Sequence, residues 1–248
     1  MVSGNNKKRT DMANVNSWHN VVKIIKQYVV KIETPNGHGT GFIVPTPAGR
    51  GNANCIVTAY HVIDHAYKWN EPIRIIYLAT GKSFILEASR RQIVTAVGRD
   101  QAIIEFSVSG ITFPTKNLAF TDEDRHYLDG ISVGWIGFPT LVPGNDCFFR
   151  GVISSYIDAT ESYLVDGVAI NGVSGGPAFV IDDDGKLVVI GLVTEYHPNT
   201  ATGKTLPGMS VVRSINPLIK YYNAELKKLK PALPRAVPSV STTSPETK

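Results

Sequence analysis

The stretch Asn171-Gly172-Val173-Ser174-Gly175-Gly176-Pro177 decides how the rest of this sequence is interpreted. A serine set among glycines marks a place where the backbone bends sharply and where another chain can approach closely. A serine hydroxyl is a weak nucleophile without an adjacent base, and the chemistry also needs backbone N–H groups directed at a developing oxyanion. The amides of Gly172 and Ser174 are the natural donors here. Ser174 is therefore the candidate nucleophile.

A candidate base and a candidate acid precede this serine. His61 lies at the end of the apolar run that begins at Cys55, and Asp100 comes just before the apolar run Ala102–Ile104. Taken singly, each residue is more typical of a structural or surface role. The order His61, Asp100, Ser174, with gaps of 39 and 74 residues, matches one known order of a catalytic triad. Asp100 would accept the Nδ1–H of His61 and fix its tautomer.

Two rival interpretations involve the segment after His61. His65 follows four residues later, which is the spacing of a helical zinc site, but Val62 stands where such a site has glutamate. We therefore expect no metal site. Asp64 is a second candidate for the triad acid, although it lies only three residues from His61.

The rest of the chain indicates an all-β fold. Short runs of β-branched and aromatic residues alternate with turns rich in Gly, Pro and Asn, and little helix separates them. Helical spacing is found only near the ends, after the N-cap candidate Ser17 and over Ile215–Leu229. The strand-like runs are Tyr28–Glu33, Gly41–Val44, Cys55–Thr58, Ile73–Leu78, Ser83–Ala88, Ala102–Val108, Ile131–Ile136, Gly151–Ile157, Ser162–Val165, Ala178–Ile181, Leu187–Thr194 and Gly208–Val212.

Composition excludes several classes of protein. The 248 residues carry a net charge of +4, with basic residues scattered, so nucleic-acid binding is not expected. No apolar window is long enough to span a membrane, and the first twenty residues lack the core of a signal peptide, so we expect a cytoplasmic protein, or a secreted one if a signal segment has been removed. The two cysteines do not form a disulfide framework and are expected to be free thiols, although a bridge between them stays open.

The chain resembles a trypsin-like serine peptidase, and within that group the HtrA/DegP-type protease domain. The resemblance rests on Gly37–Val44, Ile56–Val62, Asp100–Ile104, Val133–Pro139, Gly151–Ser154 and Ile170–Pro177. It implies two six-stranded antiparallel β-barrels with the triad between them, to which the helical spacing adds a short N-terminal helix and a C-terminal helix. It also implies hydrolysis of protein or peptide substrates without a cofactor.

The same resemblance gives a domain plan. Residues 17–229 form the peptidase domain, with lobes of about 17–115 and 116–229. Residues 1–16 and the Pro/Ser/Thr-rich tail 230–248 are expected to be disordered. No PDZ-like stretch follows residue 220.

Two features of the motifs depart from the family pattern. Val173 stands where the family usually has Asp or Asn, so a side-chain hydrogen bond that shapes the oxyanion loop is missing. Val62 replaces the cysteine that follows the histidine in digestive relatives. The departure at Val173 motivates an alternative, in which the chain is a catalytically inactive peptidase-fold protein that binds peptides or acts as a scaffold.

The resemblance also places the pocket for the P1 residue of the substrate. Its walls are expected to be Val168 and Ala169 on one segment and Thr194, Glu195 and Tyr196 on another. No acidic residue stands near Val168, which argues against a strict Lys/Arg preference. Tyr196 fills a place where a small residue leaves a deep pocket, so we expect a small or medium apolar P1 residue unless Glu195 points inward. The oligomeric state is not indicated.

Overall fold

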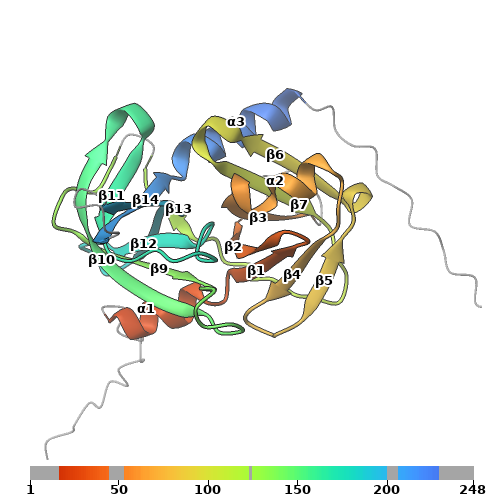
Figure 1. Ribbon diagram of the computed structural model, residues 1–248, viewed down its shortest axis with the longest axis horizontal. Coiled ribbons are helices and arrows are strands. Elements are labelled where there is room, and N and C mark those ends of the chain that lie inside the picture. The colour runs from red at the N-terminus through yellow and green to blue at the C-terminus, as the bar shows by residue number, and fades with distance from the viewer. Residues whose placement is uncertain (1–16, 45–52, 123–124, 200–205, 229–248) are drawn as a thin grey trace, which may run out of the picture.

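The computed structural model describes residues 17–44, 53–122, 125–199 and 206–228. They form two β-sheets, each curled into a lobe, and three α-helices, with the lobes side by side (Figure 1). The ends predicted to be disordered, 1–16 and 230–248, lie outside the described residues.

The first lobe is a curled sheet of seven antiparallel strands. Their order across the sheet is β5-β4-β1-β2-β3-β7-β6, and Gly41 of β2 pairs with Thr58 of β3 in the predicted hairpin. No ladder joins β5 to β6 in the described part of the chain, so the sheet curls without closing. The strands are β1 (Val29–Thr34), β2 (Gly37–Val44), β3 (Asn54–Ala59), β4 (Ile73–Tyr77), β5 (Ser83–Leu86), β6 (Arg91–Ala96) and β7 (Gln101–Phe106).

The second lobe is a closed barrel of six strands in the order β12-β9-β10-β11-β14-β13, and pairing of β12 with β13 completes the ring. β8 adds to β13 as a parallel strand. The predicted β-rich, chymotrypsin-like fold class is confirmed, with a closed six-stranded barrel here and an open seven-stranded sheet in the first lobe. The strands are β8 (Ala119–Phe120), β9 (Ser132–Gly137), β10 (Cys147–Ile157), β11 (Ser162–Asp166), β12 (Pro177–Ile181), β13 (Leu187–Asn199) and β14 (Leu206–Ser214).

The helices are α1 (Trp18–Ile25), α2 (Tyr60–Lys68) and α3 (Asn216–Lys228). The two terminal helices are those predicted, and Ser17 caps α1 by accepting a hydrogen bond from the Asn20 N–H. α2 was not predicted. None of the helices in the described ranges has the length and apolar character needed to cross a bilayer.

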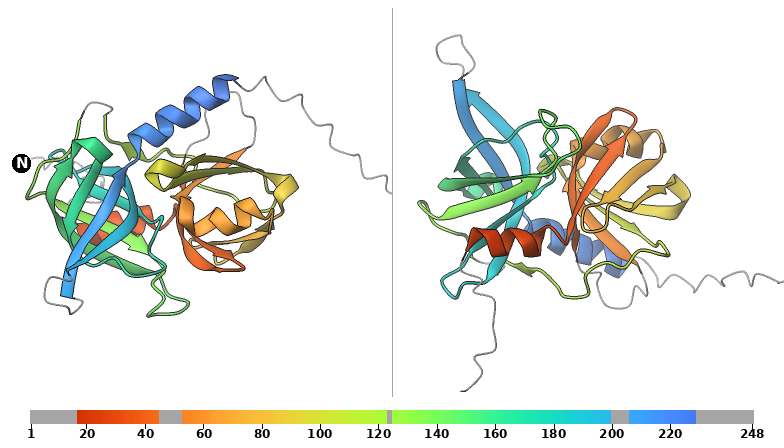
Figure 2. Two further views of the ribbon diagram at one scale, coloured as in Figure 1. Left: turned by 45° about the horizontal axis from the view of Figure 1, so that its top comes forward. Right: turned by 90° about the horizontal axis from the view of Figure 1, so that it is seen from below.

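Each terminal helix packs on the lobe to which it is not adjacent in sequence (Figures 1 and 2). α1 precedes the first lobe, yet its Trp18 ring lies 5.7 Å from Phe148 and 5.9 Å from Phe179 of the second barrel. α3 follows the second lobe, yet its Tyr222 hydroxyl donates to Glu105 of β7 at 2.8 Å. The N-terminal helix therefore packs on the second lobe, and the C-terminal helix packs on the first.

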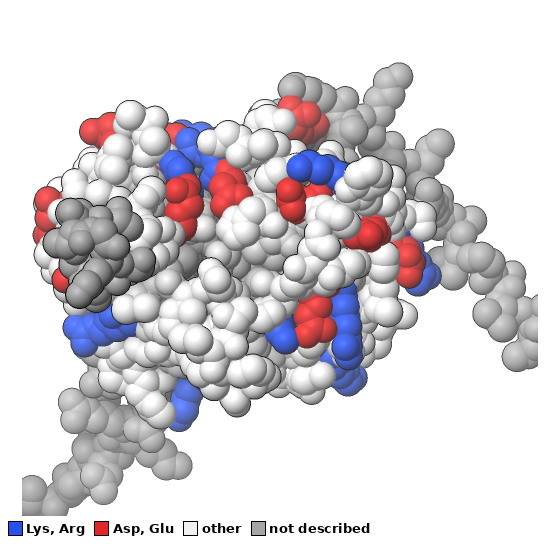
Figure 3. All heavy atoms as spheres, viewed as in Figure 1, with Lys and Arg blue, Asp and Glu red and all other residues white. Residues whose placement is uncertain are grey.

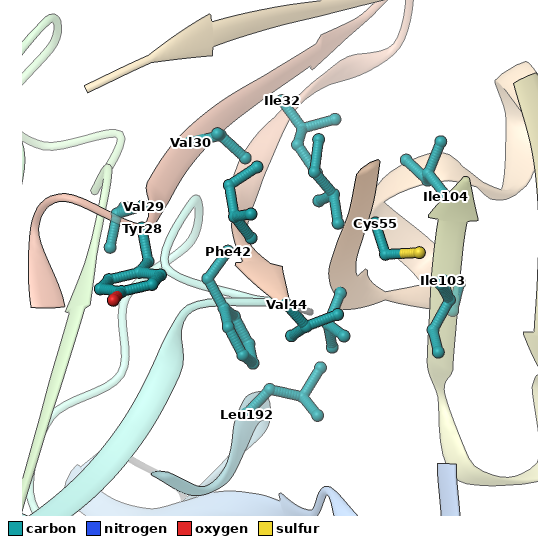
Figure 4. Close-up of a cluster of buried hydrophobic side chains, with 14 of the residues drawn as sticks. Tyr28, Val29, Val30, Ile32, Phe42, Val44, Cys55, Ile103, Ile104 and Leu192 are labelled. Atoms are coloured by element: carbon teal, nitrogen blue, oxygen red, sulfur yellow. The ribbon is translucent and has the colours of Figure 1, made fainter. Parts of the chain in front are cut away.

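Apolar side chains also join the lobes. Leu192 of β13 belongs to the same buried cluster as Phe42 and Val44 of β2 (Figure 4). Burial of one such side chain contributes about 1.5–3 kcal/mol, but it has no preferred direction. Neither Cys55 nor Cys147 forms a disulfide, and Cys55 lies inside this cluster.

Charged side chains on the face seen in Figure 3 are of both signs and interspersed. The expectation that this protein does not bind nucleic acid stays a prediction.

Candidate active site

The serine loop between β11 and β12 is held in a conformation that only glycine allows at two positions. Gly172 has φ +92° and Gly175 has φ +85°. A Cβ atom added to Gly172 would lie 2.2 Å from the Phe138 carbonyl oxygen, and one added to Gly175 would lie 2.0 Å from the Thr40 carbonyl oxygen. The glycines around Ser174 are therefore required by both backbone angle and space.

The two candidate oxyanion donors are available. Among the described residues, the N–H groups of Gly172 and Ser174 donate to no protein acceptor, whereas the N–H of Val173 between them donates to the Ile170 carbonyl at 3.0 Å. Unpaired backbone donors are rare in folded proteins unless water or a ligand takes the bond. These are the two amides that the sequence predicts as donors.

Thr40 of β2 shapes this loop from the opposite lobe. Its hydroxyl donates to the Gly172 carbonyl at 2.8 Å and accepts from the Phe138 N–H at 3.0 Å. Its own N–H donates to the Ser174 carbonyl at 2.9 Å. The sequence interpretation missed Thr40, because nothing in the stretch Gly37–Val44 indicates a partner more than a hundred residues away.

Val173, which replaces the usual acidic residue or asparagine, is fully buried in the second barrel. Its side chain packs so tightly against Gly137 that a Cβ at Gly137 would lie 2.9 Å from Val173 Cγ1. The loop is thus fixed by the apolar packing of Val173 in the second barrel and by the hydrogen bonds of Thr40 from the first lobe. These contacts take the place of the missing side-chain hydrogen bond.

Asp100 binds His61 through two oxygen atoms. Its Oδ2 lies 2.7 Å from His61 Nδ1, and its Oδ1 accepts from the His61 backbone N–H at 2.9 Å. The Asp100 carbonyl also accepts from the Tyr60 N–H at 3.1 Å. Asp100 adopts a left-handed conformation with φ 52° and ψ 45°, which turns its carboxylate toward the start of α2.

Asp100 therefore has two structural roles at once. The N-cap residue of α2 is Ala59, which has no side chain that can cap a helix. The first N–H groups of a helix need acceptors, and Asp100 supplies two of them from the turn that precedes β7. The same contact orients the imidazole of His61.

His61 and Ser174 line one cleft of about 240 Å³ between the lobes, together with Gly172, Asn171 and His38. In the described structure no hydrogen bond joins the Ser174 hydroxyl to the His61 ring. Contacts of this kind are often long before substrate binds and shorten in the complex. His61 and Ser174 thus meet at one cleft, and Asp100 contacts His61 from outside the cleft lining.

The two other candidate roles on α2, Asp64 as the triad acid and His65 as a metal ligand, involve residues that contact other partners. Asp64 accepts from Lys68 Nζ at 3.1 Å, and His65 Nδ1 lies 2.7 Å from Glu71 Oε2. His61 and His65 therefore contact different carboxylates. No group of three metal-ligating side chains occurs in the described ranges.

The predicted pocket residues lie on two neighbouring segments. Tyr196 faces Ser210 across β13 and β14, and the Ser210 hydroxyl donates to the carbonyl of Gly167, next to Val168 and Ala169. The side chain of Val168 is exposed, that of Ala169 is half-buried, and that of Thr194 is buried.

Two pocket side chains are already engaged with protein groups. The Tyr196 hydroxyl accepts from the Gly208 N–H at 2.6 Å, so its ring extends along β14. Glu195 accepts from Arg213 at 2.9 Å and lies 3.5 Å from His197 Nε2.

The hydrogen bond with Asp100 raises the pKa of His61 above its ordinary value of about 6.5. Partial burial opposes this shift, and the negative charges of Asp100, Asp64 and Glu195 add to it. Because the folded pKa is the higher one, the stability from this pair is fully present below about pH 6.5. It is lost as the pH rises through the folded pKa.

We expect the imidazole of His61 to titrate above pH 6.5 in an NMR titration, and Asp100→Asn to lower the midpoint. Asparagine can still accept the Tyr60 and His61 backbone N–H bonds, but it carries no charge. A wild-type midpoint at or below 6.5 would contradict the described contact.

Thr40→Val keeps the shape of the side chain and removes its hydroxyl. It leaves the Gly172 carbonyl and the Phe138 N–H without their buried partner, at a cost of about 1–3 kcal/mol each in the free energy of unfolding. Urea denaturation measures the loss, and Thr40→Ser should restore most of it.

Thr121→Val is the matched control. Thr121 is also buried, but its hydroxyl has no hydrogen-bond partner in the described part of the chain. Removal of that hydroxyl should therefore leave stability unchanged or raise it. Equal losses in the two valine variants would refute the role given to Thr40.

Comparison with solved structures identifies the same fold in a serine endoprotease and in Deg5. The serine endoprotease from Yersinia pestis matches with a TM-score of 0.62 and 19% identity, covering 85% of this chain and 67% of that chain. Deg5 matches with a TM-score of 0.58 and 21% identity, covering 86% of this chain and 95% of that chain. At such identities the likeness shows the fold. No curated protein sequence matches significantly.

The sequence family is defined by a second comparison. The family model described as a trypsin-like peptidase domain matches residues 39–192, from the β2 strand that carries Thr40 to the β13 strand that closes the barrel. This range contains His61, Asp100 and Ser174, and it confirms the resemblance noted in the sequence. The chain belongs to the trypsin-like peptidase family.

Proposed function

We propose that this protein is a serine endopeptidase, with Ser174 as nucleophile, His61 as general base and Asp100 as the residue that orients His61. The observation that carries the proposal is the formed His61–Asp100 contact at a cleft lined by Ser174, beside two unpaired loop amides. The family supports peptides or proteins as substrates.

The reaction follows from these positions. The Ser174 oxygen attacks the peptide carbonyl carbon while His61 Nε2 takes its proton, and Asp100 keeps the Nδ1 proton of His61 in place. The N–H groups of Gly172 and Ser174 stabilise the oxyanion. The C–N bond then breaks, His61 returns the proton to the leaving amine, and water hydrolyses the acyl-enzyme by the same route. No step needs a cofactor.

The test is labelling with a fluorophosphonate probe, read by intact mass. Wild type should gain one adduct, and Ser174→Ala and His61→Ala should gain none. Cleavage of casein by the wild type then separates a peptidase from another serine hydrolase. The alternative is an inactive peptide-binding protein. It is favoured if wild type stays unlabelled while wild type and Ser174→Ala bind peptides equally.

We also propose a narrow P1 pocket that accepts small or medium apolar residues. The Tyr196 hydroxyl is held at Gly208, and Ser210, which is paired with Tyr196, bonds to Gly167, so we expect the ring to narrow the pocket next to residues 167–169. The carboxylate of Glu195 is paired with Arg213, which removes the main reason to expect a basic P1 residue.

Tyr196→Ala should widen this pocket. The ratio of kcat/KM for a peptide with P1 Phe to one with P1 Ala should rise by about tenfold or more, since pocket discrimination of this size is common. Tyr196→Phe keeps the ring and should leave the ratio within about twofold of wild type. A ratio that does not change in Tyr196→Ala would place the P1 residue elsewhere.

A further inference from the structure

Asp100 stands between two residues whose side chains both reach the second lobe. Arg99 precedes it and pairs with Glu161, which lies at the turn between β10 and β11. Gln101 follows it, and its Nε2 donates to the Ser214 carbonyl at the end of β14 at 2.9 Å. The backbone of the candidate triad acid is therefore tied to the opposite lobe on both sides.

These contacts close into a ring. Arg99 Nε donates to Gln101 Oε1 at 3.4 Å on the first lobe, and the Ser214 N–H donates to the Glu161 carbonyl at 3.0 Å on the second. We call Arg99, Gln101, Glu161 and Ser214 the interlobe ring. Gln101 is fully buried and Ser214 is 7% exposed, so water competes little for their bond.

The ring has a consequence for the reacting groups. His61 and Asp100 belong to the first lobe, and Ser174 belongs to the second, so the distance between base and nucleophile depends on how the lobes are joined. Apolar contact between the lobes lets them slide by small amounts, whereas directional hydrogen bonds fix their relative position. Thr40 supplies such bonds at the serine loop, and the ring supplies them one residue away from Asp100 on either side.

We propose that Arg99, Gln101 and Glu161 are positioning residues, which hold the Asp100 carboxylate and through it the His61 imidazole in line with Ser174. The inference rests on the proposed serine-peptidase function for its catalytic effect. A misplacement of about 1 Å in such an arrangement can cost about a hundredfold in rate. The simpler possibility is that the ring only adds stability.

Glu161→Ala tests the proposal, because Glu161 is on the second lobe and touches neither His61 nor Ser174. We expect the rate constant for fluorophosphonate labelling to fall about tenfold or more, with KM for a peptide substrate changed less than about twofold. Glu161→Gln retains an oxygen that can accept from Arg99, and it should recover part of the rate.

Glu33→Ala is the matched control. Glu33 forms ion pairs with Lys31 and Arg74 on the first sheet, so its loss removes a comparable surface interaction that has no link to Asp100. Its labelling rate should equal that of wild type. If Glu161→Ala labels as fast as Glu33→Ala, the ring is only structural and the proposal is overturned.

An NMR titration of His61 gives a readout that does not depend on catalysis. The carboxylates that raise the pKa of His61 are Asp100, Asp64 and Glu195, so the loss of Glu161 acts on it through the position of Asp100. We expect the His61 midpoint to fall in Glu161→Ala and not in Glu33→Ala. If wild type fails to react with the fluorophosphonate probe, the proposed peptidase function is wrong. If the His61 midpoint is the same in Glu161→Ala as in wild type, the positioning role is refuted, whatever the outcome of labelling.

Discussion

The hydrogen bonds of Thr40 are the constraint on which the geometry of the cleft depends. Thr40 is fully buried, and every polar group that it offers is used: its hydroxyl and N–H bond to the serine loop, its hydroxyl also accepts from Phe138, and its carbonyl accepts from Thr58. A loop with two left-handed glycines has many accessible conformations. One residue of the opposite lobe selects a single conformation among them.

On the other side of the cleft, Asp100 likewise makes several contacts at once. Asp100 caps α2 and binds His61, so the helix that carries the base cannot form in its native position without the acid also reaching the base. The same contact therefore stabilises the helix and sets the geometry of the site. A folded protein in which His61 and Asp100 are misaligned would lose the cap of α2.

The features that could be predicted from the sequence are those with a signal in neighbouring residues. Most strands and both terminal helices have signals within a few residues, and these were confirmed. The glycine-rich serine motif is equally local, and its catalytic role stays a prediction. α2 has no such signal, because Ala59 cannot cap it and its acceptor is 39 residues away at Asp100. β6 begins with Arg91-Gln92 and has no clear alternation, and its residues are mostly half-buried at the open edge of the sheet.

The contacts that position the candidate site were missed for the same reason. Thr40 and Gly172 are 132 residues apart, and Arg99 and Glu161 are 62 apart. Polar residues of these types are common in loops and strands, and nothing in one sequence pairs them. The bond from Gly208 to Tyr196 is another example, since the position of the tyrosine was predicted but not the direction of its ring.

The crossed terminal helices have a consequence for how the molecule can be divided. Each half of the chain carries a segment that covers the other half: Trp18 inserts against Phe148 and Phe179, and Tyr222 reaches Cys55 and Glu105. A fragment cut between the sheets would therefore expose an apolar surface and also carry an unpaired helix. The helix of each fragment would fit the exposed surface of the other fragment. This protein is therefore suited to split-protein reassembly rather than to expression of its lobes one at a time.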